Sequence, residues 1–143
     1  MNIKQFYTVP QHSTFQDAAL LLIRLVAGVA FMYHGWGKIQ TPFSWMPPEA
    51  PVPGILQFLA ALSEFGGGLA WILGLLTPLA SLGIAFTMAF AAIFHISNGD
   101  PFVASAAGGG SFEPAAGYLC IAILLIAMGP GRLSFDRKLF GPR

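Results

Sequence analysis

Residues 18–38 read AALLLIRLVAGVAFMYHGWGK, an apolar run that one basic residue, Arg24, interrupts. A helix of about 20 apolar residues crosses the hydrocarbon core of a bilayer, so this run is long enough to span a membrane. The apolar part of a secretory signal peptide is shorter and uncharged. We therefore expect a retained membrane-spanning helix that carries a charge at bilayer depth.

Three further apolar segments follow, at residues 54–76, 79–96 and 113–129. Thr77-Pro78 leaves only a very short link between the first two of these segments, so their helices should be antiparallel neighbours. The sequence predicts an all-α integral membrane protein, an antiparallel four-helix bundle that forms a single domain over residues 1–143.

The distribution of Lys and Arg predicts the orientation of this bundle. The loops after the first and third segments together hold only Lys38, whereas the carboxy-terminal tail is basic, with Arg132, Arg137, Lys138 and Arg143. Because positive residues are enriched in cytoplasmic segments, we expect the tail to lie in the cytoplasm. Four crossings then place the amino terminus there too, with Lys4. The expected location is the cell (inner) membrane, as a multi-pass protein.

The composition excludes several classes of function. Of the 143 residues, 55% are hydrophobic and 9% charged, and the net charge is +1, so we expect no nucleic-acid partner, since that needs a basic patch. Cys120 is the only cysteine, which rules out a disulfide or a C-x-x-C relay within the chain.

Two opposite charges lie inside the first two apolar segments, at Arg24 and Glu64. An isolated ion at bilayer depth costs roughly 3 kcal/mol or more, so such residues normally face a partner or a wet cavity. We predict that Arg24 and Glu64 form a buried ion pair. The pair either has a functional role or only fixes the register of two helices.

Other polar residues gather toward the expected outer half of the bundle, where they predict a polar funnel above the ion pair. The candidate ligand or quinone pocket is His34, Lys38, His95 and Trp71, and the candidate funnel rim is Asp100 and Glu113. The alternative is that these side chains contact headgroups or water at the membrane interface. Two histidines without a third ligand are weak evidence for a metal or haem, so we expect no metal site and no haem.

The chain resembles the DoxX family of small four-helix membrane proteins. Three elements carry the resemblance: R-L-x-x-G-x-x-F-x-x-H-G-x-x-K from Arg24 to Lys38, E-x-x-G-G-x-x-x-x-x-G-x-x-T-P from Glu64 to Pro78, and G-P-G-R-L-S-F-D from Gly129 to Asp136. The resemblance implies a membrane component linked to an oxidoreductase system. One branch of the family is similar to the membrane subunit of a thiosulfate:quinone oxidoreductase, and another is implicated in a complex with soluble detoxifying enzymes.

Three functions remain open from the sequence. The first is a membrane subunit of a redox system that holds a quinone, with His34 or Lys38 bound to a quinone oxygen and Glu64 and Arg24 relaying a proton. The second is a small-solute transporter or permeation subunit, which would need to form a homo-oligomer. The third is a scaffold that recruits a soluble partner enzyme. The chain has no self-contained catalytic motif, so its catalytic residues are unknown.

Overall fold

The structure is a computed structural model that describes residues 7–143, and Lys4 lies outside the described residues. Within this range the ordered elements are helices and there is no strand, only two isolated β-bridges. The helices are α2 (Thr14–Gln40), α3 (Gly54–Leu73), α4 (Thr77–Ser97), α5 (Glu113–Met128) and the short α6 (Phe135–Phe140). The expectation of an all-helical protein is confirmed, with a helix in each of the four apolar segments.

Three of these helices, α2, α3 and α4, are long and apolar enough to cross a membrane, and α5 is a shorter apolar helix. Large apolar side chains such as Val26, Leu62 and Ile93 are exposed along them. In water such a surface would favour aggregation, whereas in a bilayer it faces lipid tails.

The ends of the helices follow from local sequence. Ser13 and Gln16 form a capping box at the start of α2, each side chain binding the other's backbone N–H. The helix α3 ends at Leu73 because Gly74 adopts a left-handed conformation, with φ of 63°. This turn stops α3 three residues before the predicted end at residue 76 and leaves a short link to α4.

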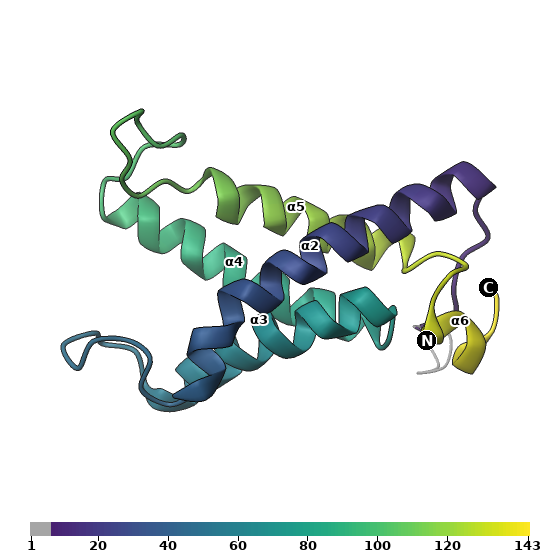
Figure 1. The fold of residues 1–143 in the computed structure, drawn as a ribbon, viewed down its shortest axis with the longest axis horizontal. Helices are drawn as coiled ribbons and strands as arrows, with labels where there is room; N and C mark the ends of the chain where they lie inside the picture. Colours follow the sequence, from purple (N-terminus) through teal and green to yellow (C-terminus); the bar gives the residue numbers. More distant parts are fainter. Residues whose placement is uncertain (1–6) are drawn as a thin grey trace.

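The helices are arranged as two hairpins that meet through α3 and α4. The helix α2 packs mainly on α3, α3 on α4 and α4 on α5, whereas α2 and α5 touch in few places. Figure 1 shows the two long loops, residues 41–53 and 98–112, at one end of the molecule, and the start of α2 and the carboxy terminus at the other. The α2–α3 and α4–α5 pairs diverge toward the end with the long loops, which we call the loop end (Figure 1).

Two glycines on α2 set its register against α3. A Cβ atom at Gly28 would lie 2.7 Å from the carbonyl oxygen of Gly68, and one at Gly35 would lie 2.5 Å from the backbone nitrogen of Phe65. Side chains at either position would push the helices apart, so glycine permits this close approach. The register places the last turn of α2 beside the middle of α3.

The segment after α5 is tied to the link between α3 and α4. The carboxylate of Asp136 accepts hydrogen bonds from the backbone N–H groups of Leu76, at 2.6 Å, and Thr77, at 2.8 Å. The backbone N–H of Asp136 donates to the carbonyl of Gly74 at 2.8 Å. A buried carboxylate thus caps the start of α4 and closes the end of the molecule opposite the loop end.

Candidate functional site

Arg24 is buried and binds backbone carbonyl groups. Its Nε donates to the carbonyl oxygen of Trp71 at 2.8 Å and its Nη2 to that of Ile72 at 3.1 Å. Its Nη1 donates to the carbonyl oxygens of Pro130, at 2.7 Å, and Leu133, at 2.9 Å. The guanidinium therefore satisfies the last carbonyls of α3 and holds the segment that follows α5.

The predicted ion pair between Arg24 and Glu64 is wrong, because Glu64 binds a different cation. Nζ of Lys38 lies 2.6 Å from Oε1 of Glu64, and none of the three ion pairs among residues 7–143 joins Arg24 to Glu64. The register explains the difference, since Arg24 lies beside Ile72, about two helical turns along α3 from Glu64. The flexible side chain of Lys38 reaches back from the last turn of α2 to the carboxylate.

The carboxylate of Glu64 is only half satisfied. Its side chain is 3% exposed, against 28% for that of Lys38. Its second oxygen, Oε2, is buried without a hydrogen-bond partner among the described residues. A buried acceptor without a partner costs free energy and calls for an explanation. The oxygen can receive a hydrogen bond after a small rearrangement.

The loop after α2 folds over Lys38 and is fastened by Gln57. The indole ring of Trp45 lies 4.6 Å from Nζ of Lys38, a cation–π contact. The Nε1 of Trp45 donates to the carbonyl of Gln57 at 2.9 Å. The buried side-chain amide of Gln57 accepts from the backbone N–H of Met46 at 3.0 Å and donates to the carbonyl of Val52 at 2.9 Å.

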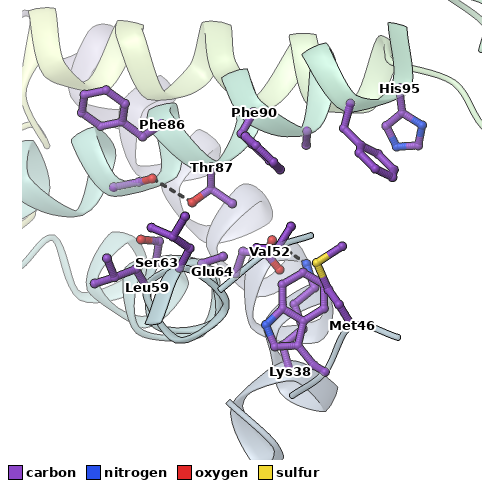
Figure 2. Close-up of a pocket in the computed structure, with 16 residues that line it drawn as sticks. Lys38, Met46, Val52, Leu59, Ser63, Glu64, Phe86, Thr87, Phe90 and His95 are labelled. Atoms are coloured by element: carbon purple, nitrogen blue, oxygen red, sulfur yellow. Dashed lines mark hydrogen bonds and ion pairs between the residues drawn. The ribbon is translucent and has the colours of Figure 1, made fainter. Parts of the chain in front are cut away.

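A cavity of about 600 Å³ lies between α3 and α4, within the size range of small-molecule sites. Figure 2 shows Lys38 and Glu64 on one side of it and the aromatic side chains of α4 on the other. The lining comes from α2 (Lys38), from the loop (Trp45, Met46, Val52), from α3 (Leu56, Leu59, Ala60, Ser63, Glu64) and from α4 (Gly83, Phe86, Thr87, Phe90, Ala91, Phe94, His95). We call this cavity the α3–α4 pocket.

His95 is at the end of this pocket and is held by an acidic partner. Its Nδ1 lies 2.7 Å from Oδ2 of Asp100, and the backbone N–H of Asp100 donates to the carbonyl of His95 at 3.0 Å. Such a contact fixes the orientation of the imidazole and leaves its Nε2 for another partner. Lys38, Glu64 and His95 are the candidate residues that line this pocket together, and Asp100, a predicted rim residue, joins them through His95.

The other candidates lie elsewhere. His34 is exposed on α2 and contacts the rings of Phe31 and Tyr118, away from the lining of the α3–α4 pocket. Trp71 is fully buried in the core and donates from Nε1 to Oγ of Ser81 at 2.9 Å. Glu113 is exposed at the start of α5.

Several residues that line the α3–α4 pocket are not among the predicted site residues. Phe86, Phe90 and Phe94 recur every four residues, which places them on one face of a helix, so this spacing was available as a signal. Gln57 gave a weaker signal, as a polar residue near the start of an apolar segment. Among the described residues, no group of three His, Cys, Asp or Glu side chains is arranged to hold a metal ion.

Comparisons with known proteins identify the family of this chain. The DoxX family model matches residues 19–96, a range that contains Arg24, Lys38, Glu64 and His95. The chain is 38% identical over 127 residues to the inner membrane protein YqjF of Escherichia coli, an alignment that covers 87% of this chain and 94% of that protein. No solved structure matches. The chain belongs to the DoxX family and is a multi-pass protein of the inner membrane.

Proposed function

We propose that this protein is a membrane component of a redox system and that the α3–α4 pocket binds a quinone. The observation that carries the proposal is the ion pair of Lys38 and Glu64 in an apolar cavity of about 600 Å³. Pockets of this kind bind small molecules through apolar walls and a few placed polar groups. A quinone offers a flat ring for the phenylalanine side chains of α4 and carbonyl oxygens for a donor.

Lys38 is the donor best placed for a ring oxygen. Its ammonium group is the more exposed member of the pair and keeps N–H groups beyond the one that Glu64 accepts. The ring of Trp45 above it restricts its movement. A charge-assisted hydrogen bond to a ligand carbonyl is stronger than one between neutral groups, and more so where water is excluded.

Glu64 is the group proposed to exchange a proton with the bound ligand, through Lys38 or directly. The absence of a partner for Oε2 among the described residues supports this assignment. A quinone supplies two-electron, two-proton chemistry when it is bound, and the protein's residues hold the ring and supply or accept the proton. Arg24 has no part in this relay, since its guanidinium donates to backbone carbonyls at the other end of α3 and in the segment after α5.

We further propose the predicted topology, a single-domain antiparallel four-helix bundle with both termini in the cytoplasm. The placement of both long loops at one end and of the carboxy terminus at the other supports it (Figure 1), as does the basic tail. The α3–α4 pocket then lies in the outer half of the membrane. The electrons would pass to or from a soluble or membrane-bound oxidoreductase partner.

Binding of decylubiquinone to the purified protein in lipid nanodiscs tests the proposal, with quenching of tryptophan fluorescence as the readout. We expect saturable binding to the wild type and about tenfold weaker binding to Lys38→Met, because a charge-assisted hydrogen bond is lost. Lys138→Met is the matched control, since Lys138 is exposed on α6, away from the pocket. Absence of saturable binding to the wild type would contradict the proposal.

A further inference from the structure

On the loop side, the wall of the α3–α4 pocket is a segment held in place by hydrogen bonds. Trp45, Met46 and Val52 line the pocket from the loop. Each is joined to Gln57 by a hydrogen bond, through the indole of Trp45, the backbone N–H of Met46 and the carbonyl of Val52. Because the side-chain amide of Gln57 is buried, opening this wall would leave buried polar groups without partners, which is costly.

The opposite wall of the pocket is apolar and faces outward. Leu59 on α3 is 48% exposed, and Phe86 and Phe90 on α4 are 71% and 57% exposed, although all three also line the pocket. Figure 2 shows Leu59 and Phe86 at the side of the pocket away from Met46 and Lys38. In a membrane-spanning helix pair, apolar side chains that are both pocket-lining and exposed mark an opening toward lipid tails rather than toward water.

From these two walls we infer that the α3–α4 pocket is loaded sideways from the bilayer, between Leu59 and Phe86, and takes an amphiphile whose apolar tail stays in that opening. This inference rests on the proposed function and adds the direction of access and the class of ligand. The head of the ligand carries a hydrogen-bond acceptor for Lys38, and its tail lies along the phenylalanine side chains of α4. A ring without a tail lacks the contacts at the opening and binds weakly.

A photoreactive ligand tests the direction of the tail. The probe is a ubiquinone ring with a ten-carbon tail that carries a diazirine near its end, added to the wild-type protein in nanodiscs and activated by light. Peptide mass spectrometry then locates the labelled residues, with and without excess decylubiquinone as competitor. We expect competable labelling on α3 around Leu59 and on α4 around Phe86.

Two matched variants sharpen the test. Leu59→Trp adds bulk at the opening, whereas Leu62→Trp makes the same change on α3 at a residue that is 47% exposed and lies outside the pocket lining. Overpacking by Trp at the opening should reduce competable labelling about fivefold or more, and the Leu62 variant should label like the wild type. Equal labelling of both variants would overturn sideways loading.

The remaining outcomes separate this inference from the proposed function. Competable labelling confined to residues 45–52 would show a ligand whose tail points to the loop side, which overturns the inference and leaves quinone binding intact. The wild type can also be compared for its affinity toward decylubiquinone and toward the tail-free ring, at equal concentration in the membrane. Equal affinity would likewise overturn the inference and leave quinone binding intact. No competable labelling and no saturable decylubiquinone binding would overturn both.

Discussion

Lys38 and Glu64 form an ion pair, with Nζ 2.6 Å from Oε1, that joins the last turn of α2 to the middle of α3, two helices long and apolar enough to cross a membrane. The pair lies under the ring of Trp45 and in the lining of the α3–α4 pocket. Because one carboxylate oxygen has no partner among the described residues, the pair is an incompletely satisfied buried network. A buried acceptor without a partner costs stability, so its presence here points to a functional role.

Breaking the pair on one side should destabilise the protein more than removing both charges. Glu64→Leu leaves the ammonium of Lys38 without its partner, and we expect a loss of about 2–4 kcal/mol. The double variant Lys38→Met/Glu64→Leu should recover about half or more of that loss, because the cost of an uncompensated ion disappears. Unfolding by SDS in mixed micelles measures both. A double variant less stable than Glu64→Leu would contradict the account.

Glu64→Gln tests the proposed proton exchange, since the amide keeps the volume of the side chain and can still accept a hydrogen bond from Lys38. We expect quinone-dependent turnover by the membrane fraction to fall about tenfold or more, as is typical for loss of a general acid or base. Glu49→Gln is the matched control, because Glu49 is exposed on the loop. Unchanged turnover in Glu64→Gln would remove the relay from the proposed function.

The contrast between Arg24 and Lys38 shows which parts of the structure the sequence could predict. The cost of burying a charge is enough to single out Arg24 and Glu64 within their apolar segments. That cost does not identify the groups that the two charges bind. A backbone carbonyl is present at every position, so a charge that binds carbonyls, as Arg24 does, leaves no pattern in the sequence. The partner of Glu64 depends on the helix register, which close contacts at Gly28 and Gly35 set.

The lining of the α3–α4 pocket could be predicted only in part, because only its polar residues are distinctive in the sequence. Polar residues stand out in an apolar sequence, so Lys38 and His95 were found, whereas most of the pocket wall is apolar and reads like any lipid-facing surface. Trp71, a predicted pocket residue, follows Glu64 by two helical turns on the same helix but lies in the core. The divergence of the two hairpins toward the loop end (Figure 1), where the pocket lies between α3 and α4, depends on tertiary packing that no local spacing encodes.

Replacing Arg24 should affect stability and leave ligand binding unchanged. Arg24→Lys keeps the charge but lacks the planar fork of donors that reaches carbonyls on two segments, and we expect a loss of about 2–4 kcal/mol. Decylubiquinone affinity of the folded fraction should equal that of the wild type. Arg132→Lys is the control, since its side chain is 59% exposed and lies 3.6 Å from Asp17, and it should lose less than about 1 kcal/mol.

The cap formed by Asp136 offers a local test of the carboxy-terminal segment. Asp136→Ala removes the acceptor of the N–H groups of Leu76 and Thr77, and we expect a loss of about 1–2 kcal/mol. Hydrogen exchange should speed up at these two amides and remain unchanged in the middle of α2. Uniform exchange across the helices would indicate a global effect instead of a lost cap.

The proposed orientation can be checked with single cysteines in a Cys120→Ala background. Ser105 is exposed in the loop between α4 and α5, and Lys138 is exposed on α6 near the carboxy terminus. A cysteine at position 105 should react with a membrane-impermeant maleimide in spheroplasts, and one at position 138 only after the membrane is permeabilised, because the basic tail favours the cytoplasmic side. Loss of labelling on prior blocking with a second impermeant thiol reagent is the control. The reverse pattern would place the α3–α4 pocket in the cytoplasmic half of the membrane, and labelling of both positions from outside would mean that α5 does not cross the membrane.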